Sequence, residues 1–319
     1  MVAGGGDRMV VRSLACVEGL PMDAYSPRCP KSFSQRVADP GNRLVVSVPE
    51  AMTDPRLRRY RLRRLRIPIG AGQVDLVVPD ARAWLREGAW VGATERGAEP
   101  PYWVNVWPAS VAVARCLVRE VLPAGRRVLD LGCGLGVPGV VAASAGATVT
   151  FADQQEDALA FASWNAERAH PERARPRCDR LDWSQTVVAG TFDVLVLADV
   201  SYRQLHHAPL LRHVDRCLAA GGLVLHADPF RSESDTFLKA LAARLVVGQL
   251  EQQVHFDGRR VRVRLACAAR NRDELPAAFQ ANASGCCASP VGSPTPSEPS
   301  STNSAQGALV DGPQRGGQA

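Results

Sequence analysis

Residues 128–136, with the sequence VLDLGCGLG, decide how the rest of the chain is interpreted. The first four residues predict a short strand, and the glycines that follow predict a sharp turn in which the backbone can approach a ligand. A helix predicted over residues 138–145 would then point its first N–H groups at that ligand. The segment therefore predicts a binding site between a strand and a helix.

Strand-like and helix-like segments alternate on both sides of this glycine loop. Alternation of this kind indicates a parallel sheet with helices on both faces. Further strands are predicted over residues 147–152, 175–181, 192–198 and 222–227, and helices over 108–122, 156–169, 208–219 and 233–244.

The pattern changes near the C-terminal end of this region. Residues 250–256 and 260–266 alternate in polarity and are joined by Asp257-Gly258, which is a strong hairpin signal. A parallel sheet that ends in an antiparallel hairpin is unusual among nucleotide-binding folds. We therefore predict an α/β, Rossmann-like sheet of seven strands, mostly parallel, with a C-terminal antiparallel hairpin and helices on both faces.

The glycine loop alone leaves two cofactors open. Gly134 to Gly139 also matches the GxGxxG pattern of NAD-binding folds. Asp130 lies two residues before the first glycine, where it would repel a pyrophosphate and attract the cationic amino group of S-adenosylmethionine (SAM). Asp153 follows at the end of the next strand and could accept hydrogen bonds from both ribose hydroxyls, as in NAD enzymes. Asp130 and the terminal hairpin favour SAM.

Two further motifs come directly after predicted strands, where ligands of open α/β sheets bind. Asp182 and Trp183 could bond and flank an adenine ring, or could be a surface acid and a buried tryptophan. Asp199 and Tyr202 should face the methyl group and its acceptor. The alternative for these two residues is a helix cap and ordinary packing.

These motifs resemble the family-16 methyltransferases, a branch of the class I, seven-β-strand, SAM-dependent methyltransferases that was once labelled nicotinamide N-methyltransferase-like. The resemblance runs from about residue 67 to residue 269. Within the branch, the electron-transfer-flavoprotein β-subunit lysine methyltransferases look closest, although they favour paired glycines after the Trp-Pro step. The motifs that carry the resemblance are Pro101-Tyr102-Trp103, Trp107-Pro108, Asp182-Trp183, Asp199-x-x-Tyr202 and Asp228-Pro229.

The resemblance implies a SAM-dependent enzyme that methylates the side-chain nitrogen of a lysine in a protein. Methylation of a small-molecule amine or other metabolite stays open, as does a non-catalytic binding module, although the intact glycines and acids argue against the module. Asp199 and Tyr202 are the expected catalytic residues. The expected cofactor-binding residues are Trp107, Asp130, Gly132, Gly134, Gly136, Asp153, Asp182, Trp183 and Asp199.

Composition limits the other classes of function. The net charge of +6 comes almost entirely from arginine, and we interpret it as a solvated basic surface and not as a nucleic-acid site. The nine cysteines include no CxxC pair, so we expect no metal site. No apolar stretch reaches the ~20 residues needed to cross a membrane. We expect a cytoplasmic protein, with a mitochondrial location as the alternative, and the oligomeric state stays open.

The expected organisation has four parts. Residues 1–50 are mostly irregular, residues 51–106 form an N-terminal extension that packs on the core, and residues 107–272 form the SAM-dependent domain. Residues 273–319 are a low-complexity tail that we expect to be disordered. The arginine-rich run 56–66 is expected to be helical, either touching a partner or packing its leucines on the domain. Residues 67–78 are expected to form two short extended pieces.

Overall fold

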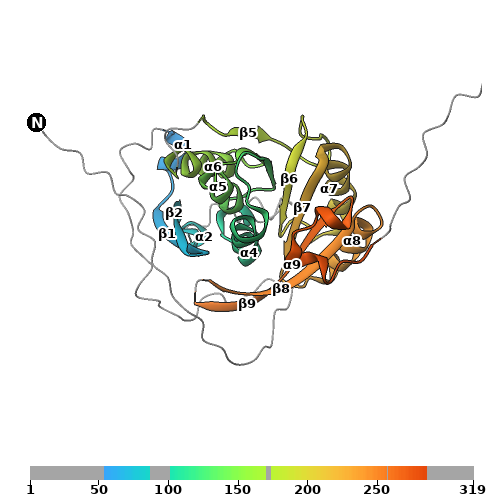
Figure 1. The fold of residues 1–319 in the computed structure, drawn as a ribbon. Helices are drawn as coiled ribbons and strands as arrows, with labels where there is room; N and C mark the ends of the chain where they lie inside the picture. The colour runs from blue at the N-terminus through green and yellow to red at the C-terminus, as the bar shows by residue number, and fades with distance from the viewer. Residues whose placement is uncertain (1–53, 87–100, 170–173, 257, 286–319) are drawn as a thin grey trace, which may run out of the picture. The chain divides into compact units, whose positions relative to one another are not determined.

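The fold is built on a seven-stranded sheet. The computed structural model describes residues 54–86, 101–169, 174–256 and 258–285, and the first 53 residues and residues 286–319 lie outside this part (Figure 1). The strand order is β5-β4-β3-β6-β7-β9-β8. The strands are β3 (Arg127–Leu131), β4 (Thr148–Asp153), β5 (Arg177–Arg180), β6 (Phe192–Ala198), β7 (Leu218–Asp228), β8 (Val246–Phe256) and β9 (Arg259–Ala269).

The first five of these strands are parallel, and β9 pairs antiparallel with both β7 and β8. The predicted fold class is therefore confirmed. Gly258 has a φ of +72°, as expected for the turn of the predicted hairpin. Asp257, the other residue of that predicted turn, lies outside the described residues.

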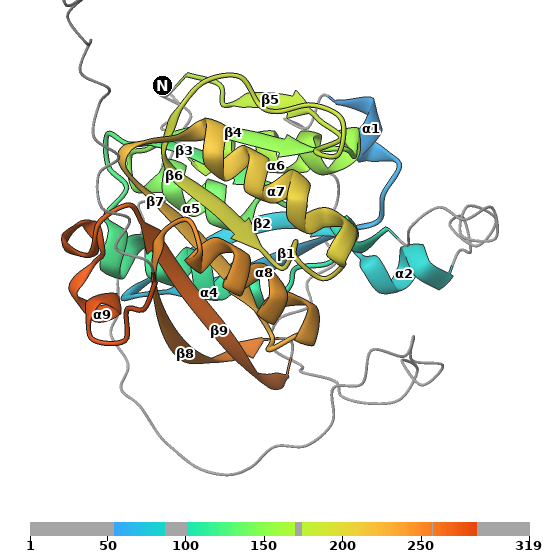
Figure 2. The ribbon, with the colours of Figure 1, turned by 90° about the vertical axis from the view of Figure 1, so that its right-hand side faces the viewer.

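Helices cover both faces of the sheet, with α7 and α8 on one face and the other three of the five longest helices behind it (Figure 2). Side chains of a strand alternate between faces, so β6 packs Val194 and Val196 into one core cluster and Leu195 and Leu197 into the other. The five helices are α4 (Pro108–Cys116), α5 (Val137–Ser144), α6 (Glu156–Ala169), α7 (Gln204–Cys217) and α8 (Ser232–Ala242).

The shorter helical elements close the ends of this framework. The helix predicted over 108–122 is divided, because α4 passes into a π-helical turn that ends at Leu122 with a φ of +50°. No helix in the described part of the chain is long and apolar enough to cross a membrane. The short elements are α1 (Pro55–Arg58), α2 (Ala81–Arg86), η1 (Tyr102–Val104), η2 (Leu117–Val121), η3 (Arg272–Glu274) and α9 (Ala277–Gln280).

The prediction of a helix over residues 56–66 is wrong. Only α1 is helical, and the chain then forms β1 (Leu62–Ile69), which pairs antiparallel with β2 (Gly72–Pro79) in a separate sheet. Leu62 and Leu65 are three positions apart, which favours a helix, whereas the alternation typical of a strand begins only at Leu65 and Ile67, and the hairpin buries all three side chains. Opposite charges also stand directly across the two strands, where Arg66 Nε donates to Asp75 at 3.0 Å.

The predicted start of the C-terminal tail is also wrong. The ordered chain continues through η3 and α9, and the Phe279 side chain is fully buried against β8. A Cβ on Gly248 would lie 2.2 Å from the Phe279 carbonyl oxygen, so glycine is required for this close approach. The low-complexity composition of the tail hid this short apolar anchor, and the boundary at residue 273 is corrected accordingly.

A buried asparagine attaches the β1–β2 hairpin to the main sheet's helices. Asn165 of α6 is 2% exposed, its Oδ1 accepts from the Val77 N–H at 2.8 Å, and its Nδ2 donates to the Val77 carbonyl at 3.0 Å. The side chain amide thus replaces the neighbouring strand that β2 lacks on this side.

We expect Asn165→Ala to lower the free energy of unfolding by about 2 kcal/mol, because both backbone groups of Val77 would be buried without partners. Urea denaturation of the full chain measures the change. Arg168→Ala, at an exposed position of the same helix, is the control and should change it by less than about 0.5 kcal/mol. Equal effects of the two variants would contradict the role of Asn165.

Candidate functional site

Two buried carboxylates lie beside the glycine loop at the carboxyl ends of β3 and β4. Asp130 is 2% exposed, and its Oδ2 accepts from the Gly139 N–H at 2.9 Å. Asp153 is 7% exposed and accepts from the N–H groups of Gly134 and Gln155, each at 2.9 Å. Backbone N–H groups of the loop and of α5 therefore fix both carboxylates that the sequence predicted.

The glycines of the loop have different roles. Gly132, Gly134 and Gly136 all have positive φ angles, at +69°, +51° and +74°. A Cβ on Gly136 would lie 2.6 Å from the Ala162 Cβ, so this glycine lets α5 pack on α6. The cofactor-binding role of Gly136 stays a prediction, and its surroundings add a packing role. A Cβ on Gly132 would lie 2.6 Å from the Trp183 ring, which places that tryptophan against the loop.

Burial raises the pKa of both carboxylates, because an ionised group loses its water. The pKa of Asp130 rises to about 7, with the Gly139 N–H opposing the shift and the charge of Asp153 adding to it. The pKa of Asp153 is raised for the same first reason, and hydrogen bonds from the backbone N–H groups of Gln155, Gly134 and Gln154 oppose the shift. Neither carboxylate contacts a basic side chain within the described residues.

Other buried acids of the sheet differ in this respect. Asp199 pairs with Arg231, and Asp228 pairs with Arg264. The two unpaired acids are therefore those beside the glycine loop. A ligand that brings an ammonium group and hydroxyl donors would offset their desolvation, whereas a pyrophosphate would be repelled. SAM carries both kinds of donor, in its amino group and in its ribose hydroxyls, and therefore fits the two carboxylates.

An aromatic cluster joins several predicted site residues above the carboxyl edge of the sheet. The ring of Tyr102 lies 6.1 Å from Trp107 and 5.7 Å from Tyr202, measured between ring centroids. His206 lies 5.1 Å from Tyr202 and 5.3 Å from Trp183. The cluster thus runs from the segment before α4, through the turn after β6, to the tryptophan that touches Gly132.

Three of these residues were predicted from the sequence, and two were missed as site residues. Tyr102 was noticed only as part of the Pro-Tyr-Trp motif. His206 was missed although it lies four residues after Tyr202, a spacing that brings side chains together at the start of a helix. The Trp107 indole also donates to the Tyr102 carbonyl at 3.0 Å, which fixes the segment before α4.

Asp182 is committed to the turn that follows β5. Its Oδ1 accepts from the Ser184 N–H at 2.9 Å and from the Ser184 hydroxyl at 2.6 Å, and its Oδ2 accepts from Gln185 at 2.8 Å. The hydrogen bonds from Ser184 are the main reason that the pKa of Asp182 is lowered. The predicted contact with an adenine ring is therefore better supported for Trp183 than for Asp182.

Asp199 lies at the carboxyl end of β6 as predicted, but its carboxylate is already paired with Arg231. Its carboxylate accepts from Arg231 Nε at 2.8 Å and from the Arg231 terminal nitrogen at 3.2 Å. Burial raises the pKa of Asp199, and the Arg231 guanidinium opposes that rise. Asp199 also has a φ of +58°, an uncommon conformation for a residue with a side chain. The sequence reading missed Arg231, which lies two residues after the Asp228-Pro229 pair.

A buried polar network supports the turn that carries Asp199 and Tyr202. The Ser201 hydroxyl lies 2.7 Å from His226 Nε2 and 2.8 Å from the Ser234 hydroxyl, and all three side chains are fully buried. Burial lowers the pKa of His226 to about 3, so the ring is neutral. Within the described residues, no group of three His, Cys, Asp or Glu side chains is placed to hold a metal ion.

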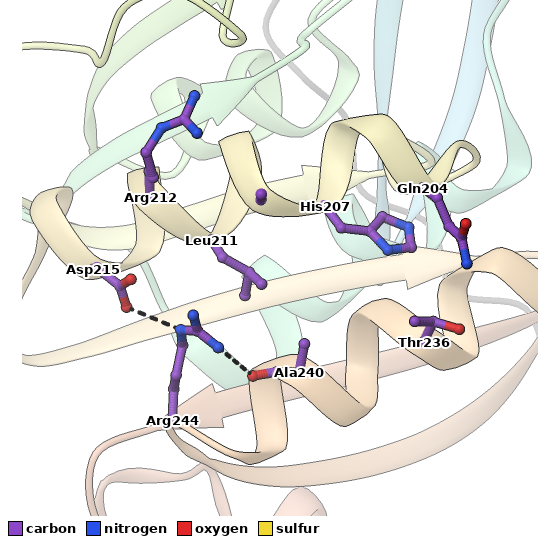
Figure 3. Close-up of a pocket in the computed structure, with 9 residues that line it drawn as sticks. Gln204, His207, Leu211, Arg212, Asp215, Thr236, Ala240 and Arg244 are labelled. Carbon is purple, nitrogen blue, oxygen red and sulfur yellow. Dashed lines mark hydrogen bonds and ion pairs between the residues drawn. The ribbon is translucent and has the colours of Figure 1, made fainter.

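Two depressions lie on the side of α7 and α8. One, of about 530 Å³, runs between these helices and contains the Asp215–Arg244 ion pair, away from the glycine loop (Figure 3). The other, of about 750 Å³, we call the Tyr202 recess. It is lined by Tyr202, Arg203, Gln204, Leu205, Ser232, Glu233 and Thr236.

Comparison with known proteins identifies the family. A family model described as lysine methyltransferase matches residues 97–244. The protein N-lysine methyltransferase METTL21A of Danio rerio is 32% identical over 162 residues, which cover 49% of this chain and 72% of that protein. The electron transfer flavoprotein beta subunit lysine methyltransferase of Danio rerio is 31% identical over 158 residues, covering 48% of this chain and 60% of that protein.

Among solved structures, the magnesium protoporphyrin IX methyltransferase of Synechocystis with bound SAM aligns with a TM-score of 0.42. It is 19% identical and covers 50% of this chain and 78% of its own. The family model spans the glycine loop and both buried carboxylates, and the first relative is matched over more than two thirds of its length. The chain therefore belongs to the lysine methyltransferase family and is a SAM-dependent methyltransferase.

Proposed function

We propose that this enzyme methylates the side-chain amine of a lysine in a protein. The relatives in zebrafish are named as protein N-lysine and electron transfer flavoprotein beta subunit lysine methyltransferases. A protein acceptor requires a site that a side chain can enter from the surface. The described residues Arg203, Gln204 and Leu205, which line the Tyr202 recess, are all exposed.

The position of Tyr202 is the observation that carries the proposal. Its ring belongs to the aromatic cluster, which reaches the glycine loop through Trp183, and the same residue lines the surface recess. Tyr202 thus links the predicted cofactor side of the site to the side that an acceptor would enter. We infer that the lysine side chain passes Tyr202 to reach the methyl group.

The residues of the chain would bind SAM, orient the two reactants and exclude water. Asp153 would hold the ribose hydroxyls of SAM, Asp130 would stabilise its amino group, and Trp183 would flank its adenine. When bound, SAM supplies a methyl group on a sulfonium, which is already activated for transfer to a nucleophile. The remaining task is alignment of the acceptor with the methyl group, which the aromatic cluster would perform. The acceptor must also be uncharged, although the pKa of a free lysine is about 10.4.

Asp153→Asn should weaken SAM binding by about 30-fold, or about 2 kcal/mol, because an amide accepts the ribose hydrogen bonds less strongly than a carboxylate. Isothermal titration calorimetry measures the affinity. The matched control is Asp193→Asn, which changes an acid at the amino end of β6 that bonds to Arg127. The control should bind SAM as the parent does. Parent-like affinity in Asp153→Asn would exclude this role.

Binding of SAM should release a proton below pH 7. The pKa of Asp130 in the folded protein, about 7, lies above its unfolded value, so folding stability falls as the pH rises from about 4 to 7. A cationic amino group favours the ionised carboxylate, so SAM affinity should fall as the pH drops below 7. Titration at pH 6 in two buffers of different ionisation enthalpy measures the proton released.

Asp130→Asn is the control for this measurement, because the amide cannot titrate. Its heat of binding should be the same in both buffers, and its affinity should not change between pH 6 and pH 7. Equal heats in the two buffers for the parent would contradict the proposed protonation of Asp130.

The acceptor class is tested with methyl-tritiated SAM and a cell extract freed of small molecules, to which a separate metabolite fraction is added. We expect label in the protein fraction and, after acid hydrolysis, elution with methylated lysines. Asp153→Asn, assayed at a SAM concentration below its weakened affinity, serves as the control and should give less label. Label confined to the metabolite fraction would contradict the proposal and favour the small-molecule amine, and label in another amino acid would contradict the lysine assignment.

A further inference from the structure

In the ion pair between Asp199 and Arg231, the positive member is the more exposed one. The Asp199 side chain is 5% exposed, whereas that of Arg231 is 21% exposed. The residues directly after Arg231, Ser232 and Glu233, line the Tyr202 recess. Arg231 is therefore the more exposed member of the pair, and it directly precedes two residues that line the recess.

A second ion pair fixes Arg231 in place. The Arg231 N–H donates to Asp228 Oδ1 at 2.8 Å, and Asp228 accepts from Arg264 Nε at 3.0 Å and from its terminal nitrogen at 3.1 Å. The Arg264 terminal nitrogen also donates to the Arg231 carbonyl at 3.4 Å. The side chain and backbone of Arg231 are thus held by Asp199 after β6, Asp228 at the end of β7 and Arg264 within β9, so its charge has a defined position.

The charges around this position nearly balance. The guanidinium groups of Arg231 and Arg264 offset the buried carboxylates of Asp199 and Asp228, and His226 is neutral. Asp235, Glu233 and Arg203 add charges on the exposed side. The charged and titratable side chains on the elements packed around Arg231 include Asp199, Tyr202, Arg203, His206, His207, His226, Asp228, Glu233, Asp235, Lys239, Arg259, Arg260, Arg262 and Arg264.

This balance matters because only an uncharged amine can attack a methyl group. A bare Asp199 carboxylate would stabilise the ammonium form of the acceptor and hold it unreactive. A guanidinium on the acceptor side has the opposite effect, since two positive charges repel. The pairing therefore suits a reaction in which the acceptor must lose its proton before transfer.

We propose that Arg231 keeps the acceptor amine uncharged in the Tyr202 recess and that Asp199 serves as its anchor. The inference rests on the proposed lysine acceptor. Arg231 acts through its charge and is thus a positioning residue. The proton leaves the amine for solvent through the recess, and no bond to Arg231 or Asp199 forms or breaks.

The test is the pH dependence of kcat, with saturating SAM and a saturating amount of the purified protein that takes label from tritiated SAM. This profile reports the ionisation of the bound acceptor. Arg231→Gln leaves the Asp199 charge unopposed, so the acidic limb of the kcat profile should shift to higher pH by about one unit. Arg231→Lys keeps the charge and should restore the parent profile.

The double variant Asp199→Asn with Arg231→Gln separates charge from structure. It removes both charges, so the acidic limb of its kcat profile should return toward that of the parent, although the ion pair is lost. A purely structural role predicts a double variant no closer to the parent than Arg231→Gln. SAM affinity, measured by calorimetry, shows that each variant is folded.

Arg127→Gln is the matched control. It breaks a similar ion pair, in which Arg127 donates two hydrogen bonds to Asp193 at 2.8 and 3.2 Å. This pair lies at the amino ends of the strands, away from the site, so the variant should leave the kcat profile unchanged. Absence of protein labelling by the parent would overturn the proposed function and this inference with it. If the parent labels protein but Arg231→Gln keeps the parent profile, this inference alone fails.

Discussion

The desolvation of two carboxylates is the constraint on which this site depends. Asp130 and Asp153 are buried where parallel strands end, and backbone N–H groups hold them in place of basic side chains. Keeping acids in this state costs free energy in the absence of a ligand. In the proposed site, a cationic, hydroxyl-bearing cofactor would offset this cost on binding. The glycine loop, the N-terminus of α5 and the Trp183 ring are arranged around these two groups.

The acceptor side follows a different electrostatic rule. There the acids Asp199 and Asp228 have arginine partners, and a neutral network of Ser201, His226 and Ser234 supports the turn. The two halves of the carboxyl edge are thus matched to the two reactants of a methyl transfer. In the proposed function, one half would offer unpaired carboxylates to a cation, and the other, where acids have arginine partners, would receive the amine.

The sequence predicted the elements whose pattern is local. Residues 156–169 and 192–198 have the predicted bounds as α6 and β6, because a long amphipathic run and a continuous apolar run each fit one structure. The spacing of the leucines in residues 56–66 favours a helix, and only the pairing with β2 makes most of this run a strand. The pairing of Asp199 with Arg231 joins residues 32 positions apart. Such contacts depend on which strand ends are neighbours, and no spacing in the sequence reveals them.

The hairpin of β1 and β2 has a consequence for how this protein behaves at high concentration. Within the described residues β1 pairs on one side only, and a strand with an unpaired edge is a template for joining other chains. The arginines along β1 place like charges on that edge, so two copies repel each other when their edges approach. We therefore expect this run to oppose edge-to-edge association of copies, and we expect salt, which screens such repulsion, to weaken that effect.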